Sequence, residues 1–200
     1  MGISRRAVSL EMREEGITPL SVDPWPHLIL DDFLPIEIFE ECLREICAED
    51  YNFEIENRGA GRIEFSILKS KTAWRAVYSK AMIALLSSAF GVNIKLNRDN
   101  FVQLRRMNDA TPAFPVHSDF ALNEDTIASF LYLSPGWKSA CGGRLHLHDT
   151  KSQNEPSLSI APLSNRLVAF RTLPSNWHSV ERVYGWERLA ILALWDIEDD

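Results

Sequence analysis

RLAILALW, residues 188–195, is the stretch that decides the fold. One charged residue is followed by an unbroken apolar run, which predicts the last strong strand of the chain. Successive side chains of a strand point to opposite faces. Alternation therefore gives two sets: Arg188, Ala190, Leu192 and Leu194 on one face, and Leu189, Ile191, Ala193 and Trp195 on the other. An arginine at the mouth of an apolar strand needs an anionic partner because burying an unpaired charge is costly, and a bidentate carboxylate is its best match. The alternative is an arginine at a strand end that reaches solvent.

Upstream, the same period of two recurs in short segments separated by Pro, Gly, Asn and Ser clusters. These predicted strands span about residues 100–106, 126–133, 144–148, 157–160, 166–171 and 176–180. Before them we expect a short strand at 27–30, a helix at about 35–49 and a longer helix at about 72–90. Helices followed by many strands predict a mainly β protein with flanking helices. Its core would be a jelly roll, or double-stranded β-helix, packed through one sheet on the N-terminal helices.

The composition fits one globular domain. The 200 residues are 46% hydrophobic, enough for a full core, and chains of this size usually fold as one unit. We therefore predict a single domain over residues 1–200, in which residues 1–22 are a candidate flexible arm and about 100–196 form the jelly-roll core. Acidic residues outnumber basic ones by 28 to 21, and the net charge of −7 gives no electrostatic footprint for nucleic acid or an anionic membrane surface.

The cysteines indicate a reducing setting. Cys42, Cys47 and Cys141 form an odd set without C-x-x-C spacing, so neither a disulfide framework nor a zinc knuckle is indicated. Cys42 and Cys47 belong to the apolar stripe of the first helix, and we expect both in the core. The longest apolar run is far shorter than a membrane span, and the N-terminal segment lacks the long apolar stretch of a signal peptide. We expect a cytoplasmic protein without membrane contacts.

PVHSDFAL, residues 115–122, places a histidine and an aspartate two positions apart beside an apolar run. On a strand, His117 and Asp119 would share a face, as two ligands of one metal must. His178, in SNWHSVE, lies on another short extended segment. Two histidines and one carboxylate make the facial triad of a non-haem iron(II) site, which leaves positions free for cosubstrate and dioxygen. The alternatives are a surface histidine with a turn-capping aspartate, and an ordinary core or surface histidine beside Trp177.

The order of these residues resembles that of the iron(II)- and 2-oxoglutarate-dependent dioxygenases: H-x-D, a distal histidine, and a basic residue shortly after it. FLYLSPGWKSACGGRLHLHD (130–149) is similar to the strand, loop and Gly-Gly-x-Leu hairpin of the prolyl-hydroxylase-like branch, which includes the oxygen-sensing prolyl hydroxylases. SIAPLSNRLVAFRTLPSNWHSVERV (159–183) is similar to that branch's approach to the distal histidine, and PWPHLILDDFLP (24–35) to the opening strand and turn of many members. The resemblance covers about residues 24–196.

The resemblance implies a role for each matching position. His117, Asp119 and His178 would bind iron(II), and Arg188 would form a salt bridge with the distal carboxylate of 2-oxoglutarate. Three protein ligands leave two positions for 2-oxoglutarate and one for dioxygen.

Three further positions concern the cosubstrate pocket. Tyr132, in LYLS, matches a tyrosine that in the oxygen-sensing members hydrogen-bonds the same carboxylate of 2-oxoglutarate. Leu145, in GGRL, matches an apolar residue that lines the pocket. Met107, in RRMND, departs from the pattern, because many members have a tyrosine there. The departure puts the second hydrogen bond to the cosubstrate in doubt and makes the pocket wall less polar.

The implied reaction is hydroxylation of an aliphatic C–H bond, with conversion of 2-oxoglutarate and dioxygen to succinate and carbon dioxide; ascorbate is a candidate reductant. A prolyl or other amino-acid residue in a protein or peptide is the leading target. A free amino acid or a natural-product intermediate stays open as target, as does the oligomeric state. The loop at 120–126 would sit at the pocket mouth, where such enzymes often place lids. Four arginines either meet an acidic target or are ordinary solvated charges: Arg62, Arg105, Arg106 and Arg144.

Two alternatives of other classes remain at this stage. HLHD holds a second pair at i, i+2, His146 and His148, and a cupin-like metal site would combine it with Glu155 and His178. That site requires Leu145 to face away from the metal, whereas the resemblance points this leucine inward. The other alternative is a non-catalytic jelly-roll module, because a fold alone does not give function.

Overall fold

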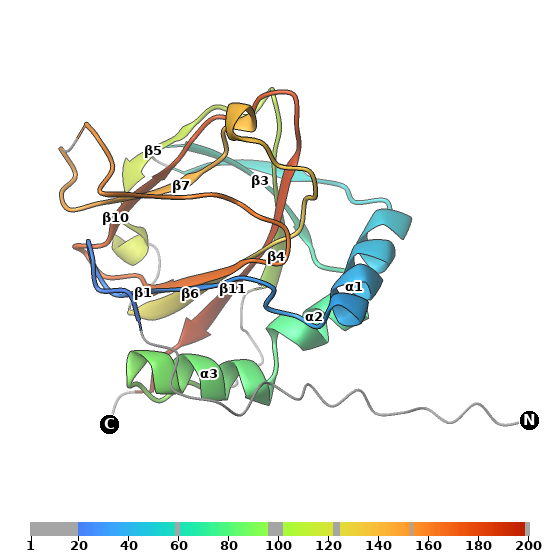
Figure 1. The fold of residues 1–200 in the computed structure, drawn as a ribbon, viewed down its shortest axis with the longest axis horizontal. Helices are drawn as coiled ribbons and strands as arrows, with labels where there is room; N and C mark the ends of the chain where they lie inside the picture. The colour runs from blue at the N-terminus through green and yellow to red at the C-terminus, as the bar shows by residue number, and fades with distance from the viewer. Residues whose placement is uncertain (1–19, 59–60, 96–101, 122–124, 153, 199–200) are drawn as a thin grey trace, which may run out of the picture.

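Two antiparallel β-sheets face each other in the computed structural model, which describes residues 20–58, 61–95, 102–121, 125–152 and 154–198 (Figure 1). Within these residues the large sheet has seven strands in the order β1-β9-β6-β11-β4-β3-β2, and the small sheet has four in the order β5-β10-β7-β8. The large sheet contains β1 (His27–Leu30), β2 (Glu54–Arg58), β3 (Gly61–Ile67), β4 (Val102–Met107), β6 (Thr126–Tyr132), β9 (Leu167–Arg171) and β11 (Arg188–Asp196). The small sheet contains β5 (Phe114–His117), β7 (Leu145–His148), β8 (Leu158–Ile160) and β10 (Trp177–Val180). The predicted jelly-roll core with flanking helices is confirmed.

β11 lies inside the large sheet, paired with β6 on one side and β4 on the other. Its two faces are both covered, as the alternation predicts. Ile191 and Trp195 belong to the apolar core beneath the helices. Ala190 and Leu192 belong to a second core between the two sheets. The charged end of the strand therefore points into the space between the sheets.

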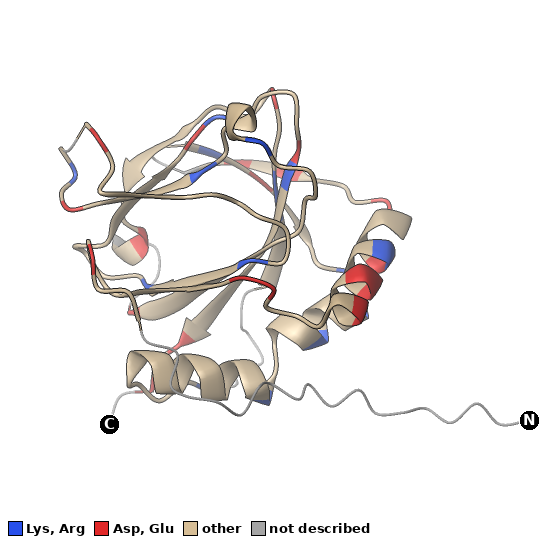
Figure 2. Cartoon of the chain, in the orientation of Figure 1, with Lys and Arg blue, Asp and Glu red and all other residues tan. Residues whose placement is uncertain are grey.

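The helices cover the outer face of the large sheet (Figure 1). α1 (Ile36–Ala48) buries Phe39, Cys42 and Ile46, and several of its other positions are acidic (red in Figure 2). The prediction that Cys42 is a core residue is confirmed, but the same prediction for Cys47 is wrong, because Cys47 is exposed. It follows the buried Ile46 by one position, a turn of about 100° around the helix axis, and so leaves the buried stripe.

The second predicted helix, at 72–90, is two helices: α2 (Lys71–Val77) and α3 (Lys80–Phe90). Ser79 has extended backbone and caps α3 by accepting a hydrogen bond from the Met82 N–H at 3.2 Å. Tyr78, at the break, stacks on Trp195 of β11 with ring centroids 5.0 Å apart. The apolar stripe runs through the break because both helices pack on the same sheet, so the helical period alone does not reveal it.

The β2–β3 hairpin is the part of the fold that our sequence analysis leaves unassigned. The alternation of Ile63, Phe65 and Ile67, directly after a glycine at 61, is the signal that could have found it. The hairpin extends the large sheet beside β4. The arm proposed at 1–22 lies outside the described residues except for 20–22. Among the described helices, none has the length and apolar character needed to cross a bilayer.

Candidate metal centre

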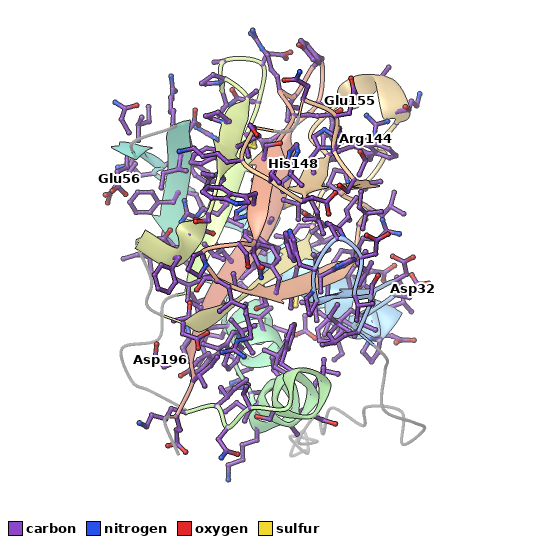
Figure 3. All side chains as sticks on the ribbon, turned by 90° about the vertical axis from the view of Figure 1, so that its left-hand side faces the viewer. Asp32, Glu56, Arg144, His148, Glu155 and Asp196 are labelled. Atoms are coloured by element: carbon purple, nitrogen blue, oxygen red, sulfur yellow. The ribbon has the colours of Figure 1, made fainter. Side chains whose placement is uncertain are left out.

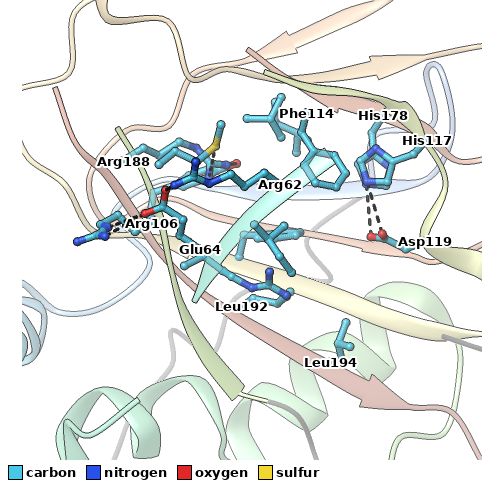
Figure 4. Close-up of a pocket in the computed structure, with 17 residues that line it drawn as sticks. Arg62, Glu64, Arg106, Phe114, His117, Asp119, His178, Arg188, Leu192 and Leu194 are labelled. Carbon is cyan, nitrogen blue, oxygen red and sulfur yellow. Dashed lines mark hydrogen bonds and ion pairs between the residues drawn. The ribbon is translucent and has the colours of Figure 1, made fainter. Parts of the chain in front are cut away.

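Three potential ligands converge at the edge of the space between the sheets. β5 and β10 are antiparallel neighbours, and their register sets His117 directly opposite His178. The Nε2 atoms of these histidines lie 3.5 and 3.4 Å from the two carboxylate oxygens of Asp119 (Figure 4). One ligand atom from each residue lies within 4.8 Å of the others, and this is the one such group found in the described part of the chain.

Asp119 reaches this point by a different route from the one that the spacing predicts. β5 ends at His117, and Asp119 begins a short 3-10 turn, η1 (Asp119–Ala121). The carboxylate therefore faces the histidines because the chain turns after the strand, not because the strand alternates. Residues 122–124 of the proposed lid at 120–126 lie outside the described residues.

Both histidines are held in the same way. The Nδ1 atom of each lies close to the carbonyl oxygen two residues earlier, that of Pro115 at 2.8 Å for His117 and that of Asn176 at 3.0 Å for His178. A carbonyl only accepts, so Nδ1 is the donor and the lone pair of a neutral ring is left on Nε2, facing Asp119. This tautomer is the one that metal coordination through Nε2 requires.

The electrostatics fit a cation between these groups. Burial opposes ionisation of Asp119, but the contacts with His117 and His178 outweigh burial and hold the pKa of this carboxyl well below its ordinary value. Burial also lowers the pKa of His178, yet the contact with Asp119 outweighs it and raises this pKa. An ionised carboxylate and two imidazoles thus attract positive charge to one point. The donor set of two nitrogens and one oxygen suits iron(II).

A pocket runs from these residues toward Arg188, the first residue of β11. Its lining includes His117, Asp119, His178 and the following side chains implied by the resemblance: Arg188, Tyr132, Leu145 and Met107. Tyr132 and Leu145 are almost fully buried, at 1% and 2% exposure. The structure therefore brings every site residue expected from the sequence to one cavity.

Arg188 is a buried cation with spare hydrogen-bonding capacity. Its exposure is 5%, which excludes the alternative of an arginine that reaches solvent. Nη2 donates to the Tyr132 hydroxyl at 3.2 Å, and Nη1 approaches the Met107 sulfur at 3.9 Å. Nε has no hydrogen-bond partner, and no carboxylate among the described residues forms an ion pair with this guanidinium. A buried, unpaired charge is costly, so the pocket is built for an anionic ligand at this end.

The second histidine pair lies on the other face of the small sheet. His146 contacts the Ser159 hydroxyl at 2.8 Å and Glu181 at 3.1 Å. His148 contacts the Ser179 hydroxyl at 2.9 Å. The leucines that alternate with these histidines pack in the core between the sheets. The pair therefore points away from His178, and the described residues offer no cupin-like cluster.

Sequence reasoning left several pocket residues without a role. Arg62 comes from β3, Arg105 and Arg106 from β4, and Phe114 from β5. The sequence leaves the role of these arginines open, because only the pairing of β3 with β4 brings them together beside the pocket.

Two histidines and a carboxylate within a jelly roll define the class of non-haem iron oxygenases. Comparison with known proteins agrees: residues 104–195 match the model of the 2OG-Fe(II) oxygenase superfamily. This half of the chain is therefore similar to the superfamily whose cofactors are iron(II) and 2-oxoglutarate.

One curated protein to which the chain is similar is a prolyl hydroxylase. Prolyl 3-hydroxylase OGFOD1 of Mus musculus is 30% identical over 186 residues, which cover 86% of this chain and 33% of that protein. The chain thus spans about a third of the length of this curated relative.

Solved structures show the same fold. A prolyl hydroxylase from Trichoplax adhaerens, in complex with a hypoxia inducible factor oxygen degradation domain peptide fragment, has a TM-score of 0.67 at 19% identity, covering 84% of this chain and 82% of that one. A prolyl 4-hydroxylase from Phytophthora capsici has a TM-score of 0.66 at 21% identity, covering 86% and 58%. One from Pseudomonas putida has a TM-score of 0.61 at 18% identity, covering 86% and 93%.

Proposed function

We propose that this chain is an iron(II)- and 2-oxoglutarate-dependent dioxygenase that hydroxylates an aliphatic C–H bond. His117, Asp119 and His178 would hold iron(II), and Arg188 with Tyr132 would hold the distal carboxylate of 2-oxoglutarate. The observation that carries the proposal is the pairing of two incomplete sites in one pocket: a converged His-Asp-His group and a buried arginine without an anion.

The residues of the chain divide the work. Iron(II), when bound, supplies the redox chemistry by which 2-oxoglutarate, dioxygen and a C–H bond become succinate, carbon dioxide and a C–OH group. The carbonyls of Pro115 and Asn176 fix the ring orientation of the two histidines. Arg188 and Tyr132 orient the cosubstrate from the far end of the pocket. Leu145 belongs to an apolar wall that excludes water from the reacting groups.

The proposed target is a prolyl or other amino-acid residue in a protein or peptide. The similarity to prolyl 3-hydroxylase OGFOD1 favours it, as does the peptide bound by the Trichoplax adhaerens relative. A free amino acid or a natural-product intermediate is the alternative for the same chemistry. We further propose one domain over residues 1–200, a cytoplasmic location, dioxygen as co-reactant and ascorbate as reductant.

The test is turnover of the purified chain with iron(II), 2-oxoglutarate and a panel of prolyl peptides and free amino acids. We expect succinate to form in step with a gain of one oxygen in the mass of one panel member. Succinate formed without such a product would support the reaction class and exclude the tested targets. Absence of iron binding and of succinate would overturn the proposal in favour of a non-catalytic module.

A further inference from the structure

The segment that leads into Arg188 is the loop between β10 and β11, residues 181–187. This loop reaches the surface, where Tyr184 is 56% exposed. Arg188 itself is 5% exposed, and its Nε has no hydrogen-bond partner among the described residues. Because a buried charge without an ion-pair partner is costly, opening of the loop would favour movement of the guanidinium into water. The contacts that hold the loop therefore bear on whether Arg188 stays in the pocket.

One side of the loop is bound to the segment that precedes β7. The Tyr184 N–H donates to the Cys141 carbonyl at 2.9 Å, and the Gly143 N–H donates to the Arg182 carbonyl at 3.1 Å. Backbone hydrogen bonds of this kind do not depend on side chains. They fix the middle of the loop beside the glycine pair at 142–143.

The loop and the stem of Arg188 pack around the same point. A Cβ added to Gly143 would lie 3.3 Å from Cδ of Arg188. The same Cβ would lie 3.2 Å from a methyl group of Val183 and 3.7 Å from the ring of Trp186, both of which belong to the loop. A shift of the loop would therefore change the packing of the arginine that follows it.

The other side of the loop is held by Asp109, in the turn between β4 and β5. Its Oδ1 accepts a hydrogen bond from the Gly185 N–H at 2.8 Å, and its carbonyl accepts one from Nη2 of Arg182 at 2.8 Å. Met107, two positions before Asp109, is the residue opposite Arg188 in the pairing of β4 with β11. Asp109 thus connects the loop before Arg188 to the strand that pairs with Arg188.

The turn that carries Asp109 is itself firmly held. Thr111 is fully buried, and its N–H donates to the Asn108 carbonyl at 2.9 Å. The Thr111 hydroxyl donates to Oε1 of Glu64, a 2% exposed residue of β3, at 3.1 Å. The Ala110 N–H donates to Oδ1 of Asn108 at 2.9 Å. Asp109 is therefore presented by a fixed turn to a loop with exposed residues.

We propose that Asp109 is a positioning residue for 2-oxoglutarate: its carboxylate holds the β10–β11 loop through Gly185 and so keeps Arg188 in the pocket before the cosubstrate binds. The inference rests on the proposed function of Arg188. A guanidinium that is already in place needs less ordering when its ligand binds, and this raises affinity. Loss of the carboxylate should therefore weaken the binding of 2-oxoglutarate and leave the turnover rate at saturation nearly unchanged.

The first measurement is the affinity for 2-oxoglutarate of the iron(II)-loaded protein, by calorimetry without oxygen. We expect Asp109→Ala to raise the dissociation constant about two- to tenfold, as loss of one hydrogen bond allows. Asp109→Asn should restore the affinity, because the amide oxygen still accepts the Gly185 N–H. Asp149→Ala is the matched control: Asp149 is also exposed and accepts a hydrogen bond from the Ser157 hydroxyl, at 2.6 Å, outside this loop.

The second measurement is cleavage by trypsin after Arg182, which needs neither metal nor cosubstrate. Val183 is fully buried, so the loop must open before this bond is cut. We expect Asp109→Ala alone to be cut faster, with the fragment that begins at Val183 identified by mass spectrometry and the melting temperature as control for folding. Equal cleavage of Asp109→Ala and the natural chain, or faster cleavage with unchanged affinity, would overturn the inference. A natural chain that does not bind 2-oxoglutarate would instead overturn the proposed function.

Discussion

The small sheet carries two histidine pairs that differ in the face they occupy. His117 and His178 lie opposite each other on β5 and β10 and point toward the large sheet. His146 and His148 stand two positions apart on β7 and point outward, because the leucines that alternate with them pack in the core between the sheets. Figure 3, which draws the side chains as sticks, labels His148. Spacing gives the members of a pair a common face, and the place of the strand in the fold decides which face it is.

The two pairs also differ in which ring nitrogens form hydrogen bonds. His117 and His178 each use Nδ1 on a backbone carbonyl and keep Nε2 for the convergent site. His146 uses both ring nitrogens, one on the Ser159 hydroxyl and the other on Glu181. A ring with both nitrogens engaged has no lone pair for a metal. The inner pair is thus prepared for coordination, and His146 is not. His148 uses Nε2 on the Ser179 hydroxyl, and its buried Nδ1 has no hydrogen-bond partner among the described residues.

The largest effect should follow removal of an inner histidine. We expect His178→Ala to lower iron(II) affinity more than about 100-fold, because loss of a ligand exceeds the 10–100-fold effect typical of residues that only support one. Metal content after dialysis and succinate formation measure the result. The melting temperature of the metal-free protein serves as control for folding. Stoichiometric iron retained by a folded variant would remove the inner pair from the metal site.

The next effect concerns the opposite wall of the same pocket. Arg188→Leu should raise the 2-oxoglutarate concentration needed for half-maximal turnover at least about tenfold, since a charge-assisted contact contributes about 1.5–3 kcal/mol. Arg144→Leu, which removes an arginine that binds Glu181 outside the pocket, should leave that concentration unchanged. Equal half-saturation in Arg188→Leu and the natural chain would contradict the assignment.

The sequence predicts the β core well because a strand with one covered face alternates apolar and polar residues, and a strand with two covered faces is a short continuous apolar run. β11 is of the second kind, with its two residue sets on the two faces expected. Local sequence patterns are less informative where tertiary packing determines the position of a helix break or a turn. The break at Ser79 depends on the stacking of Tyr78 on a strand far away in sequence, and the turn that brings Asp119 back to the histidines leaves no periodic signal.

The residues of the site also fall into two groups, those that the sequence predicts and those that it does not. The ligand group and Arg188 are found from spacing and family resemblance, because the chemistry allows few residue types at these positions. The cluster of Arg62, Glu64 and Arg106 is not, since its ion pairs depend on β3 lying beside β4 in the folded chain. A surface charge and a pocket charge look alike in a sequence. Burial and partners separate them.

A smaller effect tests how the pocket holds its arginine. Gly143 has φ +73°, and a Cβ there would lie 3.3 Å from Cδ of Arg188. Gly143→Ala should therefore displace the guanidinium and raise the half-saturating 2-oxoglutarate concentration severalfold. Gly136→Ala is the matched control, because Gly136 also has φ +73° but no neighbour within 4 Å of the added Cβ. It carries the backbone strain without the contact. The same increase in both variants would attribute the effect to strain alone.

The smallest effect should come from the outer histidine pair, and it decides the comparison. The double variant His146→Ala with His148→Ala removes every imidazole of β7, together with the contact between His146 and Glu181. Because these rings point away from the cavity, we expect unchanged iron stoichiometry and unchanged succinate formation. Stability should fall, since the variant loses a partly exposed ion pair worth about 0–1 kcal/mol and the buried His148 ring with its hydrogen bond to Ser179. Metal analysis and urea unfolding measure the two quantities on one preparation. Loss of iron at unchanged stability would mean that the face of the sheet does not separate the two pairs, and that the H-x-H motif takes part in the metal site after all.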